Sequence, residues 1–154
     1  MENSLNDSND VGARAAVMAV LARAQFDELA EALGALEPVP AAADLRPPET
    51  GLVMLRGRTG GDGAPFNLGE ATVSRASVRL EGGAVGFCYR LGRDLRAARA
   101  AAVIDALWQD RARRDAVEAA LVPVTARLSA EDSAVRTETA ATKVDFFTLV
   151  RGED

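Results

Sequence analysis

Residues 66–105, FNLGEATVSRASVRLEGGAVGFCYRLGRDLRAARAAAVID, contain a β-hairpin followed by a helix. Gly82 and Gly83 fit a two-residue turn of the primed type, which needs residues that adopt positive φ angles. In the register set by this turn, one face of the hairpin is almost entirely apolar, and a shift of one residue would mix the two faces. The facing pairs on the apolar face are Leu80 with Val85, Val78 with Phe87, Ala76 with Tyr89, and Ser74 with Leu91.

The other face of this hairpin carries arginines. The same register sets Arg75 opposite Arg90, with Arg79 nearby, and like charges that face each other destabilise a sheet. Something negative should therefore lie there: a ligand phosphate, a carboxylate from elsewhere in the chain, or a partner protein. A solvated face on which the long side chains splay apart is an equal alternative. Arg93 could join an anion site with the hairpin arginines, because it lies beside the start of the next helix.

A Gly-Arg-Asp corner leads from the hairpin into that helix. Asp94 is a natural N-cap, since its carboxylate can accept a free N–H group of the first turn. Alanines and larger apolar residues recur at helical spacing as far as Trp108, and small side chains allow a close approach to a sheet. We expect a paired or surface role for Asp105, because a single carboxylate is a poor signal for a cation site. Phe87, Tyr89 and Trp108 are expected in the core.

The N-terminal part of the chain predicts two helices and a strand. Residues 10–36 change their apolar face partway, which predicts two helices that meet near Gln25, the first of them capped by Asp10. Residues 38–48 are rich in proline and alanine and indicate an extended connector. Residues 50–58 predict a strand.

The segments on either side of the central stretch are simpler. The glycine-rich residues 59–65 indicate a flexible turn, because neither Gly-Lys-Ser/Thr nor a helix start follows them, as a phosphate-binding loop would require. Residues 111–120 predict a helix that ends by Pro123, and the acidic residues after Ser129 predict another that runs to about Thr142. Near the end, Phe146, Phe147 and Leu149 indicate a last strand or a segment that docks on a partner.

Together these segments predict an α+β fold: a single domain with a small antiparallel sheet and helices packed on one face. A chain of 154 residues with 48% hydrophobic residues can form one core. We expect this domain over residues 11–154, after a polar, disordered lead at residues 1–10. The lead lacks the basic and apolar regions of a secretory signal, so we expect a cytoplasmic protein.

Charge and composition exclude several function classes. A formal net charge of −5 argues against general binding to nucleic acid, and no apolar run is long enough to predict a membrane span. With no histidine and with Cys88 as its single cysteine, the chain predicts no intrachain disulfide, no thiolate zinc cluster and no other metal site. Nucleophilic chemistry of the Ser-His or Cys-His type is excluded within this polypeptide.

Three stretches resemble PhnG, the G subunit of the bacterial carbon–phosphorus lyase core complex. They are ETGLVMLRGRTGGDGAPFNLGEATVSRASVRLEGGAVGF, LGRDLRAARAAAVIDAL and KVDFFTLVRG, and the resemblance covers roughly residues 14–152. It implies a role in phosphonate catabolism, beside the H, I and J subunits and the L protein. It further implies that the complex uses MgATP as a substrate and forms a ribose 1-alkylphosphonate 5-triphosphate with release of adenine. No catalytic residue is carried over, and no cofactor is expected on this chain alone.

Three hypotheses about function follow. The first is an accessory, non-catalytic or partly contributing subunit of the triphosphate synthase. The alternative is a module that binds MgATP or another polyphosphate directly through Arg75, Arg79, Arg90 and Arg93. A stand-alone catalyst is the weakest, because the spacing of the candidate acids Glu70, Asp94, Asp105 and Asp145 makes no acid–base pair.

Overall fold

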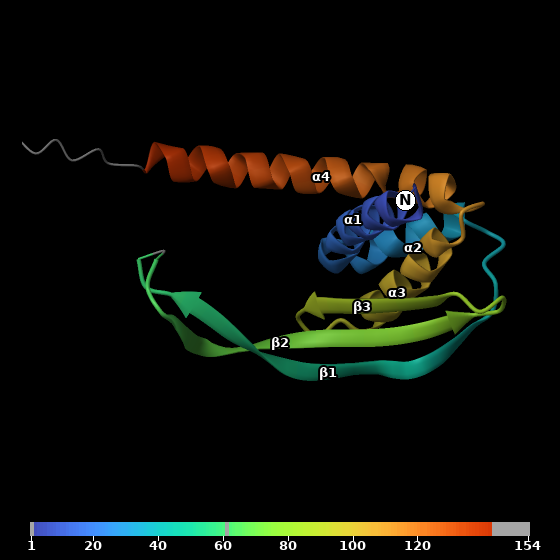
Figure 1. The fold of residues 1–154 in the computed structure, drawn as a ribbon, viewed down its shortest axis with the longest axis horizontal. Helices are drawn as coiled ribbons and strands as arrows, with labels where there is room; N and C mark the ends of the chain where they lie inside the picture. The colour runs from blue at the N-terminus through green and yellow to red at the C-terminus, as the bar shows by residue number, and fades with distance from the viewer. Residues whose placement is uncertain (1, 61, 143–154) are drawn as a thin grey trace, which may run out of the picture.

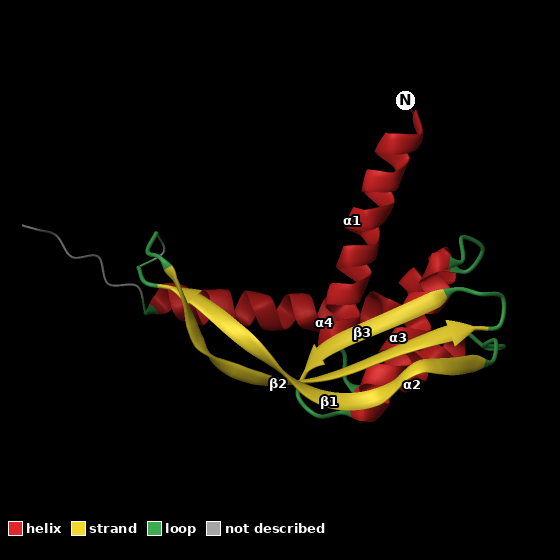
Figure 2. Cartoon of the chain, turned by 60° about the horizontal axis from the view of Figure 1, so that its bottom comes forward, coloured by secondary structure: helices red, strands yellow, loops and turns green. Residues whose placement is uncertain are grey.

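The computed structural model of the protein describes residues 2–60 and 62–142. Four helices and one antiparallel sheet of strand order β1-β2-β3 form the predicted α+β fold (Figure 1). The helices lie on one side of the sheet, as expected, while the opposite face of the sheet is open (Figures 1 and 2). The elements are α1 (Glu2–Arg23), α2 (Phe26–Ala35), β1 (Ala42–Arg58), β2 (Pro65–Leu80), β3 (Val85–Leu91), α3 (Leu95–Gln109) and α4 (Arg114–Ala141).

Two of the predicted helix boundaries are confirmed. Gln25 is the N-cap of α2, so the chain breaks where the apolar stripe changes face. The backbone N–H of Gln25 donates to Glu28 Oε2 at 2.7 Å. Asp94 caps α3 by accepting a hydrogen bond from the backbone N–H of Ala97 at 2.9 Å. Both caps satisfy N–H groups that the first turn of a helix leaves free.

Other boundaries differ from the sequence-based expectation. α1 already begins at Glu2, so Asp10 lies inside that helix and is not its N-cap. β1 begins at Ala42 and takes in much of the expected connector. α4 continues through Pro123 and past Ser129 as one helix. Proline inside a helix costs about 3 kcal/mol, and the apolar stripe of α4 that packs on the core offsets this cost; its buried members are Val117, Leu121, Val124 and Leu128.

The register of the β2–β3 hairpin is one residue away from the predicted one. Leu80 donates its N–H to Ala84 O at 2.9 Å, so three residues, not two, connect the strands. Gly82 and Gly83 both have positive φ, which makes this longer turn accessible. Arg79 therefore faces Val85, and every later pair shifts with it.

This shift exchanges the two faces of β3. Gly86 and Cys88 face the helices and are buried, whereas Phe87, Tyr89 and Leu91 keep 47%, 53% and 71% of their surface exposed. The expectation that Phe87 and Tyr89 belong to the core is wrong. The expectation for Trp108 is confirmed, because that side chain is only 1% exposed.

Gly86 is the reason that β3 can present this face to α3. A Cβ atom at this position would lie 1.9 Å from the carbonyl oxygen of Ala102 and 2.6 Å from the backbone nitrogen of Ala106. Backbone atoms of a packed helix cannot move aside as a flexible side chain can. The alanines of α3 and the missing side chain of Gly86 thus bring helix and strand into direct backbone contact.

The substitution Gly86→Ala should destabilise the fold by about 3 kcal/mol, because the new methyl group would push α3 away from the sheet. Gly34→Ala is the matched control: its Cβ would meet nothing within 4 Å. In helix α2 this control should stabilise the protein by about 0.5 to 1 kcal/mol. Urea unfolding followed by the fluorescence of the buried Trp108 measures both changes. Equal effects of the two substitutions would contradict the assigned contact.

Candidate anion or partner site

Arg75 finds its negative partner within the chain. On the open face of the sheet, its Nε lies 2.6 Å from Glu49 Oε1, and its Nη1 donates to the Tyr89 hydroxyl at 3.1 Å. The hydrogen bonds to Tyr89 and Glu49 raise the pKa of Arg75. Of the partners that the sequence left open for Arg75, the structure thus places an intrachain carboxylate beside it.

Arg90 lies on the opposite face, toward the helices. It pairs with Ser74 across the strands, so the expected juxtaposition with Arg75 is wrong. Its Nη2 donates to the carbonyl oxygen of Ala24 at 2.7 Å, which ties β3 to the junction of α1 and α2. The Nε and Nη1 atoms of Arg90 are buried and find no partner within the described residues.

Arg79 and Arg93 are exposed, and no hydrogen bond or ion pair joins either of them to the rest of the described chain. Arg79 follows the alternation of β2 onto the open face with Arg75, while Arg93 lies at the corner before α3. The sheet therefore separates Arg75 and Arg79 from Arg90. The four arginines do not converge on one anion site.

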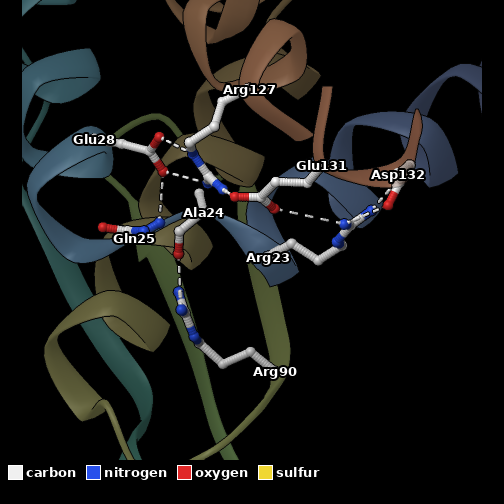
Figure 3. A network of polar contacts seen from close by, with 8 residues as sticks. All are labelled: Arg23, Ala24, Gln25, Glu28, Arg90, Arg127, Glu131 and Asp132. Atoms are coloured by element: carbon white, nitrogen blue, oxygen red, sulfur yellow. Dashed lines mark hydrogen bonds and ion pairs between the residues drawn. The ribbon is translucent and has the colours of Figure 1, made fainter. Parts of the chain in front are cut away.

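On the helix side of the sheet, near Arg90, a network of hydrogen bonds and ion pairs joins the helices (Figure 3). Arg127 of α4 holds Glu28 of α2 through contacts of 2.6 and 2.8 Å, and its third nitrogen lies 2.6 Å from Glu131. The hydrogen bonds from Arg127 hold the pKa of Glu28 below its usual value. Arg23, in the last turn of α1, binds Asp132 at 2.7 Å. This network joins three helices, and its charges are already paired.

Asp105 forms a contact that sequence reasoning only partly anticipated. Although fully buried, its carboxylate accepts bonds from Arg14 Nε at 3.0 Å, Arg14 Nη2 at 2.8 Å and the backbone N–H of Phe87 at 2.9 Å. The paired role expected for Asp105 is confirmed. The sequence signal for this contact was a single acid within the apolar stripe of a helix. Because buried charges are found paired, such an acid indicates a basic partner from another segment.

Together with Gln109, Asp105 also binds backbone groups at the outer edge of β3, near the start of the strand. Gln109 Nε2 donates to the carbonyl oxygen of Val85 at 2.6 Å, next to the Phe87 N–H that Asp105 accepts. These backbone groups point away from β2 and would otherwise be free to pair with another strand. Two outward backbone groups near the start of β3 are thus occupied by side chains of α3.

The three candidate acids that the structure describes have separate environments and do not form a catalytic pair. Asp94 serves as the cap of α3 and Asp105 is held by Arg14, whereas Glu70 lies on an exposed part of β2. Asp145 lies outside the described residues. Within residues 2–60 and 62–142, no cluster of three metal-ligating side chains is found. Burial raises the pKa of the Cys88 thiol to about 11, so this cysteine is a poor nucleophile at neutral pH.

A groove of about 760 Å³ lies between α2, α3 and the start of β1. Its walls are mainly apolar, and the Arg96 guanidinium carbon lies 4.3 Å from the centre of the Phe26 ring at its side. Arg99, also on the wall, is bound to Asp44 at 2.8 Å. The sequence did not predict this groove, because its lining comes from three separate segments. Its walls suit an apolar group better than a polyphosphate.

Comparison with known proteins identifies the family. The family model described as phosphonate metabolism protein PhnG matches residues 12–152. The chain belongs to the PhnG family. It is also 54% identical to the alpha-D-ribose 1-methylphosphonate 5-triphosphate synthase subunit PhnG of Rhizobium meliloti (strain 1021), with all of both chains covered. The resemblance found in the sequence is thereby confirmed.

Two further expectations for this PhnG-family chain concern the docking segment near its end and membrane-spanning helices. The proposed docking residues Phe146, Phe147 and Leu149 lie outside the described residues. In the part of the chain that is described, no helix combines the length and the apolar character needed to cross a bilayer.

Asp105→Ala should lower the free energy of unfolding by about 3 to 5 kcal/mol, because it removes a fully buried carboxylate and leaves the Arg14 charge and the Phe87 N–H without this acceptor. Asp132→Ala is the matched control, since it removes an aspartate from the exposed ion pair with Arg23. Exposed pairs contribute little, so the control should unfold almost as the parent does. Urea titrations of both variants test the difference, and losses of similar size would contradict the special role of Asp105.

Proposed function

We propose that this chain is an accessory subunit of the carbon–phosphorus lyase core complex. In this role it supports the formation of alpha-D-ribose 1-methylphosphonate 5-triphosphate from ATP and methylphosphonate, with release of adenine. The observation that carries the proposal is the 54% identity, along the whole of both chains, to a subunit of that synthase. Relatives this similar over their full length share a fold, and so share the surfaces through which a subunit acts.

The contacts of the described residues support a subunit without a catalytic centre of its own. Asp94, Asp105 and Arg75 are all engaged in bonds that hold the fold together. The thiol of Cys88 is buried, and the sequence contains no histidine. Reactive groups are therefore supplied by neighbouring subunits, and this chain contributes surfaces to the assembly.

The partners in this proposal are the I, H and J subunits and the L protein, and the compartment is the cytoplasm. The resemblance to the family implies that the nucleosidase-like step belongs to the I subunit, which makes that subunit the partner closest to the reaction supported here. MgATP is a substrate of the complex and is not held by this chain alone. Neither nucleic acid nor a membrane is a partner, in keeping with the net charge of −5.

Co-expression tests the subunit assignment. A tagged copy of this chain should co-purify with the I, H and J subunits in a fixed ratio through size-exclusion chromatography. When expressed alone, it should be poorly soluble, because surfaces that partners cover would face water. A fully stable free monomer that associates with none of these subunits would overturn the assignment.

Calorimetry separates this function from direct polyphosphate binding. Titration of the isolated chain with MgATP should give no saturable heat, because Arg75 is already paired with Glu49 and Arg90 lies across the sheet. The double variant Arg75→Ala/Arg79→Ala should behave in the same way as the parent. Saturable binding by the parent that this double variant abolishes would favour the alternative, in which the chain is a polyphosphate-binding module.

A further inference from the structure

β1 and β2 continue well past the end of β3 as a two-stranded ribbon. This ribbon, here called the arm, consists of residues 52–58 of β1 and residues 65–71 of β2. The last pair of β2 with β3 is Val73 with Leu91, so no third strand among the described residues accompanies the arm. Figures 1 and 2 show it projecting from the rest of the sheet, and Figure 1 shows α4 separated from it.

Large apolar side chains of the arm are exposed on both of its faces. Leu52 and Met54 alternate onto one face and keep 61% and 51% of their surface in solvent. Leu55 points to the other face and is 41% exposed. Phe66 pairs with Gly57 and is 44% exposed, and its ring lies 3.4 Å from where a Gly57 Cβ would be, on the face of Leu55. Within residues 2–60 and 62–142, no element forms a layer over either face of the ribbon.

Such a ribbon is not stable by its own contacts. An isolated pair of strands is at best marginal in water and needs a third strand or a packed layer. Apolar side chains gathered on an exposed surface mark a site of interaction with another molecule. Because the arm exposes apolar groups on opposite faces, a flat partner surface or a single short segment would cover only half of them.

From this geometry we infer that the arm inserts into an apolar cleft of another protein subunit, whose walls cover both faces. The inference rests on the proposed function, and it names the surface by which this chain joins the complex. A second copy of the arm, or residues 143–154 of this chain, would leave one face in water. The occupant that matches the exposed surface is therefore a different folded subunit with a cleft.

The charged side chains near the tip of the arm indicate which groups the inside of that cleft must contain. Arg56 shares the face of Leu52 and Met54 and lies beyond them toward the tip; among the described residues it has no ion pair or hydrogen bond. Arg58, at the end of β1, donates to the backbone oxygen of Gly63, and no other partner for it is found among the described residues. A charge that enters an apolar cleft must be paired. The deep end of the cleft therefore carries at least one carboxylate.

The test uses the co-expressed I, H and J subunits as the probe. Two double variants each replace the large apolar side chains on one face of the arm: Leu52→Ser/Met54→Ser and Leu55→Ser/Phe66→Ser. Each should reduce the recovered complex about tenfold or more, as the loss of central apolar contacts does at interfaces. The control is Val122→Ser/Val135→Ser on α4, which changes residues that are 60% and 61% exposed and should leave recovery unchanged. Circular dichroism spectra confirm that each variant is folded.

The outcomes distinguish this inference from the proposed function. If the parent assembles and both arm variants fail, the inference is supported. If only one variant fails, or neither does, the cleft is refuted while the subunit assignment stands. If the parent chain itself does not assemble with the I, H and J subunits, the inference and the proposed function are both refuted. The inference is also overturned if the parent alone sediments as a dimer that the arm variants dissociate, because a second copy would then cover the arm. It is likewise overturned if a chain ending at Thr142 loses hydrogen-exchange protection that the full chain shows in the arm, because residues 143–154 would then cover it.

Discussion

The buried carboxylate of Asp105 is the contact on which the arrangement of the sheet and helices depends. One carboxylate of α3 binds the guanidinium of Arg14 on α1 and the backbone N–H of Phe87 on β3. Since a buried charge is tolerated only with partners, the three elements must meet at this point. Gly86 then fixes how closely α3 can approach, because its missing Cβ makes room for the backbone of Ala102.

This contact also explains why one face of the sheet is left open. Among the described residues, all packing onto the sheet comes from the side where α3 lies, and the turn of the β2–β3 hairpin sends Phe87 and Tyr89 to the other side. Sequence patterns alone favoured a register with both aromatic residues in the core. The three-residue turn overrides that pattern, because only Gly86 fits against the helix.

The same reasoning bears on the candidate site. Arg75 lies beside the carboxylate of Glu49, although the facing pair of Arg75 and Arg90 from which a negative partner was inferred does not form. Strand alternation could not reveal that Arg90 faces the helices, because a change of one residue in the turn moves it across the sheet. Glu49 was also hidden from sequence analysis, since it belongs to a strand that begins earlier than its prolines suggested.

Local sequence determined where most elements lie: the break at Gln25, the cap at Asp94 and the antiparallel hairpin all follow from contacts between near neighbours in the chain. The α+β class and the family resemblance likewise follow from the amino-acid sequence by itself. Tertiary packing alone decided the hairpin register, the continuity of α4 through Pro123 and the pairing of Asp105. The reason is physical, since each of these depends on atoms far apart in the sequence, whose packing outweighs a local preference of a few kcal/mol.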